Sequence, residues 1–171
     1  MGTGNSGNYF GTYGARANND KKTRTHNNRK ANHEHVVSWA EKKASELTPT
    51  QRGKFNTATV AYDESTGKYY YGRNAGIEKD GHPKNPILFG DANNPGLLPS
   101  ASLNGYKLGN CAEVDAVNSA LNAGAKLENL HLTTIHTTKN AMGKAKPACQ
   151  NCTYSFRGKV KRNYTGWHKE E

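Results

Sequence analysis

The chain has 171 residues, enough for one domain, whereas two independent cores would fit only with difficulty. Lysine and arginine number 24 against 14 acidic residues, which gives a formal net charge of +10, and only 33% of the residues are hydrophobic. No stretch approaches the roughly 20 apolar residues of a membrane span, and the first residues lack the apolar segment of a secretory signal peptide. We therefore expect neither a membrane-spanning nor a self-exporting protein, and the charge favours nucleic acid or another polyanion as a partner.

The first thirty residues differ in composition from the rest of the chain. Residues 1–30 carry six basic residues and one acidic residue, are rich in glycine and asparagine, and show no apolar periodicity. We interpret them as a linker or loosely ordered arm, which serves either as a plain tether or as a phosphate-binding arm. Residues 31–171 then form the folded domain.

Local patterns predict the elements of the first half of that domain. Apolar residues at helical spacing predict a helix from His33 to Leu47, which Thr48-Pro49 ends. Two β-rich runs, residues 57–62 and 68–73, are separated by five residues that close at Gly67, and they predict a hairpin. Residues 76–109 are rich in proline, glycine and asparagine and predict a long loop of the kind that usually carries function.

The second half continues with alternating helices and strands. A helix is predicted from Cys111 to Ala123, ended by Gly124, with Asp115, Ser119 and Asn122 facing outward. A strand follows at residues 130–137, then a short helix that opens at Pro147 and runs to Phe156, and a last strand at residues 160–164. This order predicts an α/β sandwich around a mixed sheet.

Three cysteines and one glutamate carry the chemistry that the sequence suggests. An odd number of cysteines excludes a complete disulfide framework, and Cys149 and Cys152 have the spacing of a metal hook that shares one helical turn. Cys111 and Cys149 both lie at predicted helix starts, where the helix dipole favours thiolates. Three thiolates on one zinc ion leave the fourth position for water, and Glu113 lies close enough in sequence to stand beside that water. Reduced thiols suit a cytosolic working place.

Two segments of the chain resemble the signature of the zinc-dependent cytidine deaminase superfamily, His- or Cys-x-Glu followed by Pro-Cys-x-x-Cys. They are Gly109-Asn-Cys-Ala-Glu-Val-Asp-Ala-Val-Asn-Ser-Ala-Leu121 and Lys146-Pro-Ala-Cys-Gln-Asn-Cys152, the second with an additional Ala148 after the proline. More narrowly, they look like the YwqJ-like deaminases, which are toxin domains of bacterial polymorphic toxins. The resemblance covers residues 55–156 and implies a three-layer α-β-α sandwich with a mixed sheet of four to five strands.

The resemblance also implies an activity. One catalytic zinc would be held by Cys111, Cys149 and Cys152, and Glu113 would shuttle protons in a hydrolytic deamination. We expect cytosine in nucleic acid to be converted to uracil, with DNA favoured over RNA. The basic charge suits a polymeric anion better than a free nucleoside. The family further implies a cognate immunity protein, while the lack of a long apolar stretch predicts no membrane partner. The family also implies that the domain is secreted as part of a larger bacterial toxin and acts in the cytoplasm of the recipient cell.

Other functions stay open at this point. A free cytidine or nucleotide deaminase would use the same three-cysteine site, and an adenine deaminase acting on nucleic acid would use the same apparatus. A non-catalytic zinc module that binds nucleic acid belongs to a different class. It would normally need a fourth ligand, which is not evident in the sequence, and it would leave Glu113 without a role.

Candidate substrate contacts surround the two motifs. Asn74 follows the predicted hairpin and either contacts a base or sugar or is a turn residue. Lys146, together with Lys139 and Lys144, either binds phosphate or belongs to a solvated loop. Tyr154 either shapes the pocket floor or packs in the core. The remaining candidate contacts at the two helix starts are Ala112 and Pro147.

Overall fold

The computed structural model describes residues 13–105 and 107–165, and it has an α/β fold with one mixed sheet of four strands. The chain divides into two compact units, residues 1–31 and residues 32–171. The sheet and the predicted site lie in the second unit. Residues 1–12 of the predicted arm lie outside the described residues. Within the described part of the chain, no helix is both long and apolar enough to cross a membrane.

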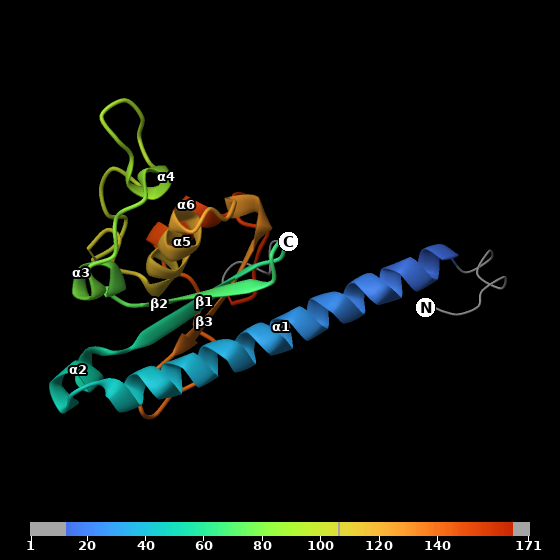
Figure 1. Cartoon of the computed structure of the whole chain (residues 1–171), viewed down its shortest axis with the longest axis horizontal. Helices are drawn as coiled ribbons and strands as arrows, with labels where there is room; N and C mark the ends of the chain where they lie inside the picture. The colour runs from blue at the N-terminus through green and yellow to red at the C-terminus, as the bar shows by residue number, and fades with distance from the viewer. Residues whose placement is uncertain (1–12, 106, 166–171) are drawn as a thin grey trace. The chain divides into compact units, whose positions relative to one another are not determined.

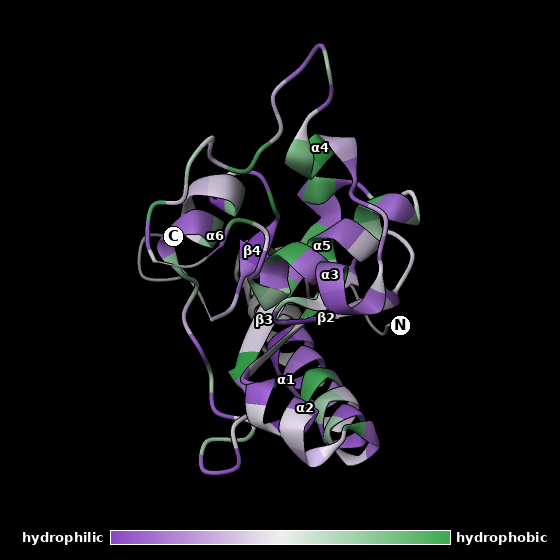
Figure 2. Cartoon of the chain, turned by 90° about the vertical axis from the view of Figure 1, so that its left-hand side faces the viewer, coloured by the Kyte–Doolittle hydropathy of each residue, from purple (hydrophilic) through white to green (hydrophobic). Residues whose placement is uncertain are grey.

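The first helix starts earlier than the sequence predicts. Helix α1 (Tyr13–Glu46) begins at Tyr13 instead of His33, so the second part of the predicted arm is helical. Most of this helix is hydrophilic (Figure 2). Residues 13–46 contain no proline, and extending a helix avoids the cost of starting one, so an apolar stripe is not required throughout. Helix α1 ends at Glu46, next to the predicted end at Leu47. Thr48 then caps a further short helix, α2 (Pro49–Lys54).

The predicted hairpin is confirmed and forms one side of the sheet. Strand β1 (Thr57–Asp63) pairs antiparallel with β2 (Lys68–Arg73), and on its other side it pairs antiparallel with β3 (Leu130–His136). Strand β4 (Arg162–Asn163) is shorter than predicted and runs parallel to β3. The strand order is therefore β2-β1-β3-β4, and the prediction of a mixed sheet holds.

Helices pack on both faces of this sheet. Helices α5 (Ala112–Asn122) and α6 (Gln150–Phe156) lie on one face, and residues 32–46 of α1 lie on the other (Figure 1). A short 3-10 helix (Leu127–Asn129) leads from α5 into β3. Alternate strand residues point to opposite faces and fill two separate cores. The first core includes Ala61, Leu132, Val117 and Phe156, and the second includes Val60, Ile135, Val36 and Ala40.

A glycine allows α5 to lie directly on β2. A Cβ atom at Gly72 would lie 2.3 Å from the Ala116 nitrogen and 2.6 Å from the Ala112 carbonyl oxygen. No side chain fits into that space, so glycine at this position permits the close approach of strand and helix. This contact fixes the first turn of α5, which carries Glu113, against the sheet.

The long segment after the hairpin covers α5. It contains two short helices, α3 (Gly76–Asp80) and α4 (Pro86–Phe89), and its side chains bond to the face of α5 that was predicted to be exposed. The prediction that Asp115 faces outward is wrong, because its exposed fraction is 1%. Helical periodicity identifies one buried face, and it does not reveal that a separate segment covers another.

Candidate metal centre and pocket

The three cysteines meet where two helices begin. Cys111 is the N-cap residue of α5, and Cys149 is the N-cap residue of α6. The sulfur atoms of Cys111, Cys149 and Cys152 all lie within 4.8 Å of one another, and the Cys111 and Cys149 sulfurs are 3.0 Å apart. Residues separated by 38 positions in sequence thus form one cluster, as the sequence predicts.

The segment between β3 and α6 sets the position of the second helix. After β3, the chain turns back along the end of that strand, and Ala145 forms an antiparallel bridge with Ile135. The Lys146 backbone N–H then donates to the Thr134 carbonyl oxygen at 3.0 Å. This pairing delivers Lys146 and Pro147 to the start of α6, beside the first turn of α5.

Asn151 anchors the turn of α6 that holds two of the cysteines. Its side chain is buried, and its Oδ1 accepts a hydrogen bond from the Leu103 backbone N–H at 2.8 Å. Its Nδ2 donates to Ser102 Oγ at 3.2 Å. Because Asn151 lies between Cys149 and Cys152, this anchoring limits the movement of the cluster.

The cluster stabilises negative charge on one sulfur. The pKa of Cys149 is lowered to about 2, because its sulfur accepts hydrogen bonds from the thiols of Cys111 and Cys152 and from backbone N–H groups at the start of α6. The same contacts raise the pKa values of Cys111 and Cys152. A thiolate is a soft ligand that zinc accepts readily.

Glu113 lies beside the cluster as a buried carboxylate with an unpaired oxygen. Its exposed fraction is 4%, and Oε2 has no hydrogen-bond partner among the described residues. Burial, followed by the negative charge of Cys149, raises the pKa of Glu113 to about 7. A carboxyl group in this state exchanges a proton near neutral pH.

This donor set fits a zinc ion. Three sulfur atoms converge, and the described residues provide no fourth His, Cys, Asp or Glu ligand within that group. Three protein ligands leave one tetrahedral position for water or substrate, which is the pattern of catalytic zinc sites. The orphaned oxygen of Glu113 is the kind of group that such a site uses.

A pocket of about 240 Å³ is lined by Glu113 and by two cysteines of the cluster, Cys111 and Cys149. Four of the predicted substrate contacts line it: Asn74, Ala112, Lys146 and Pro147. Tyr154 does not line it, and at 63% exposed it is not in the core either, so both interpretations of that residue are wrong. Tyr154 lies on the outer side of α6, while its neighbours Ser155 and Phe156 are buried. Lys139 and Lys144 are exposed outside the lining.

The sequence did not reveal three further lining residues, Asn56, Thr57 and Asn110. Asn56 and Thr57 lie at the start of β1, outside both motifs, and Asn110 immediately precedes Cys111 within the first motif. The structure also supports the turn interpretation of Asn74, whose Oδ1 accepts the backbone N–H groups of Asn56 and Thr57 at 3.0 and 3.2 Å.

Comparisons with models of protein families, with curated proteins and with solved structures found no match.

Proposed function

We propose that this chain is a zinc-dependent hydrolytic deaminase that converts cytosine to uracil in nucleic acid, with DNA as the favoured substrate. One observation carries the proposal: a buried carboxylate with an unpaired oxygen lines the same pocket as Cys111 and Cys149, two of the three clustered thiols. A structural zinc site needs the ligands but has no use for such a carboxylate.

The residues divide the chemistry between them. Cys111, Cys149 and Cys152 would hold the zinc, which when bound acidifies a water molecule and supplies it as the nucleophile. Glu113 accepts a proton at Oε2 and delivers protons to N3 of cytosine and to the departing amine. Its pKa of about 7 suits both directions of transfer. The pocket walls hold the base so that C4 faces the nucleophile.

The fold supports this proposal at the level of architecture. The order β2-β1-β3-β4, with α5 and α6 on one face and residues 32–46 of α1 on the other, is consistent with the three-layer sandwich of the cytidine deaminase superfamily. In that interpretation, α5 and α6 are the two helices whose first turns supply the zinc ligands.

The charge supports a polymeric substrate. The net charge is +10, and Lys146 lines the pocket. A free nucleoside gains little from such a field, whereas a nucleic acid strand gains at each phosphate. From the resemblance of the two motifs, we also propose that the domain is the toxin part of a larger secreted bacterial protein. It would act in the cytoplasm of the recipient cell and be neutralised by a cognate immunity protein.

The proposal is tested by incubating zinc-loaded protein with matched single- and double-stranded DNA of mixed sequence, followed by sequencing. We expect C-to-T changes with the unaltered protein and none with Glu113→Gln, while elemental analysis finds zinc in both. A-to-G changes would keep the mechanism and overturn the choice of base. Unaltered DNA and RNA, with no ammonia released from cytidine, would overturn the proposal.

A further inference from the structure

A chain of hydrogen bonds beside the pocket fixes the orientation of the Asn56 amide. The Lys146 ammonium donates to Thr57 Oγ1, and because an ammonium has only hydrogens to offer, the hydroxyl oxygen must accept. The hydroxyl hydrogen of Thr57 therefore points to Asn56 Oδ1, 2.7 Å away. With its carbonyl oxygen held in this way, Asn56 has the two hydrogens of its Nδ2 available for the pocket that it lines.

The side-chain amide of Asn74 is also held with its oxygen paired and one hydrogen left to donate. Its Oδ1 accepts two backbone N–H groups, and its Nδ2 donates one hydrogen to the Lys54 carbonyl oxygen at 2.8 Å. The second hydrogen of Nδ2 has no partner among the described residues. Asn56, Asn74 and Lys146 together form a side of the pocket that we call the donor wall, because their hydrogen bonds to neighbouring residues leave these side chains with further hydrogens to donate.

A donor wall distinguishes cytosine from adenine by elementary chemistry. In a deamination, the ring nitrogen next to the reacting carbon must face the proton donor Glu113. In cytosine, the reacting carbon is C4 and this nitrogen is N3, and the ring atom after N3 is C2, which carries a carbonyl oxygen. In adenine, the reacting carbon is C6 and the nitrogen is N1, and the ring atom after N1 carries only a hydrogen. An amide N–H directed there gains a hydrogen bond with cytosine and is left unpaired with adenine.

We propose, on the basis of the proposed deaminase function, that Asn56 Nδ2 donates to the C2 carbonyl oxygen and thereby selects cytosine over adenine. Thr57 is the positioning residue, because its hydroxyl bridges Lys146 and Asn56 and prevents the amide from turning over. At 5% exposed, Thr57 is shielded from the water that would otherwise compete for this bridge.

Three substitutions test the donor wall. Asn56→Asp replaces the amide NH₂ by an acceptor at nearly constant size, Thr57→Val removes the bridging hydroxyl, and Thr57→Ser keeps it. Turnover is measured on single-stranded thymine oligonucleotides that contain one cytosine or one adenine. We expect Asn56→Asp and Thr57→Val to lower the ratio of cytosine to adenine turnover by about tenfold, the value of one hydrogen bond. Thr57→Ser should keep the ratio, and zinc content should stay constant in all three.

The outcomes separate the donor wall from the deaminase proposal. An unchanged ratio in Asn56→Asp and Thr57→Val would overturn the donor wall, while turnover by the unaltered protein leaves the deaminase proposal standing. If the unaltered protein turns over neither oligonucleotide, the deaminase proposal fails, and fluorescence anisotropy then decides with the same single cytosine or adenine placed in a strand of abasic residues, since thymine also carries a C2 carbonyl oxygen. A preference for the cytosine strand that Asn56→Asp removes would support the donor wall, and equal binding would overturn it.

Discussion

Helix α5 carries one buried carboxylate at its pocket end and another on the side that residues 73–90 cover, and the two differ in their hydrogen-bond partners. Glu113 and Asp115 are two residues apart, and burial raises the pKa of both. Asp115 Oδ2 accepts the Arg73 backbone N–H at 3.0 Å, and Oδ1 lies 2.8 Å from His82 Nδ1. Glu113 Oε2 has no such partner among the described residues. Burial alone therefore does not distinguish the two carboxylates, whereas the presence of hydrogen-bond partners does.

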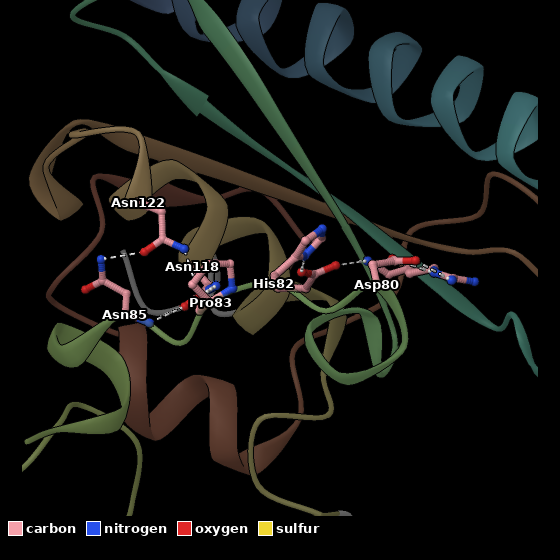
Figure 3. A network of polar contacts seen from close by, with 8 residues as sticks. Asp80, His82, Pro83, Asn85, Asn118 and Asn122 are labelled. Atoms are coloured by element: carbon pink, nitrogen blue, oxygen red, sulfur yellow. Dashed lines mark hydrogen bonds and ion pairs between the residues drawn. The ribbon is translucent and has the colours of Figure 1, made fainter.

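The side of α5 that carries Asp115 belongs to a wider network of polar contacts (Figure 3). Arg73 donates to Asp80 with two nitrogen atoms, and Asn118 donates to the Pro83 carbonyl oxygen at 2.7 Å. The Asn85 backbone N–H in turn donates to Asn118 Oδ1 at 2.7 Å. Polar contacts therefore attach this segment to α5, and they give the buried polar residues of the helix a structural role.

The largest effect is expected at the cysteine cluster. Cys152→Ser removes a buried sulfur ligand, so zinc binding and deamination should both be lost. The melting temperature should fall as it does when a chelator removes zinc, because a metal bound by the folded state alone stabilises that state, by about 4 kcal/mol at a thousandfold excess over Kd. Ser155→Ala is the matched control on the same helix, with zinc content unchanged. A zinc-loaded Cys152→Ser protein would contradict the assignment.

The second largest effect, a loss of stability, is expected at Asp115. Asp115→Ala leaves the Arg73 N–H and the His82 ring without their buried partner, which should lower the free energy of unfolding by about 3 kcal/mol. Urea denaturation measures this loss. Gly76→Ala should act at the same place, because the new Cβ would lie 1.9 Å from Asp115 Oδ2. Stability equal to that of the unaltered protein in both variants would show that the network is dispensable.

A smaller effect is expected at Asn118. This side chain is fully buried and bonds to Pro83 and Asn85, so Asn118→Ala should cost about 2 kcal/mol in urea denaturation. Asn122→Ala removes an exposed amide that also donates to the Pro83 carbonyl oxygen, and we expect about 0.5 kcal/mol or less. Equal losses from the two variants would contradict the importance of burial.

The smallest effect is expected from the Arg73–Asp80 pair and depends on pH. The hydrogen bonds from Arg73 lower the pKa of Asp80 below its ordinary value of 3.8. The pair therefore stabilises the fold above that value and loses its effect as the pH falls through the lowered pKa. Because Asp80 is partly exposed, the contribution at pH 7 should be about 1 kcal/mol or less. Asp80→Asn should remove this part of the acid dependence in urea titrations, and an unchanged dependence would refute it.

Patterns within one segment predict most of the elements. The hairpin around Gly67 and the helices that begin near Cys111 and Cys149 follow from periodicity and turn residues. The three cysteines and Glu113 could also be predicted, because their spacing within each motif reflects a single helical turn.

Contacts between distant segments could not be predicted. Asn56 and Thr57 join the pocket because β1 begins beside the end of β3 and the start of α6, a pairing that no local pattern encodes. The burial of Asp115 depends on a covering segment about forty residues upstream, which the sequence suggests only as a loop. The sequence places the start of α1 too late for another reason: a helix made of polar residues shows no apolar periodicity.

The role of Glu113 is tested by comparing Glu113→Gln with Asp115→Asn in one experiment, with melting temperature and cytosine deamination measured on both proteins. We predict that Glu113→Gln melts at or above the temperature of the unaltered protein and has no activity, because it neutralises a buried carboxylate whose Oε2 has no hydrogen-bond partner among the described residues. Asp115→Asn should melt lower and keep its activity per folded molecule. A destabilised but active Glu113→Gln protein would contradict the assignment of Glu113 to the chemistry.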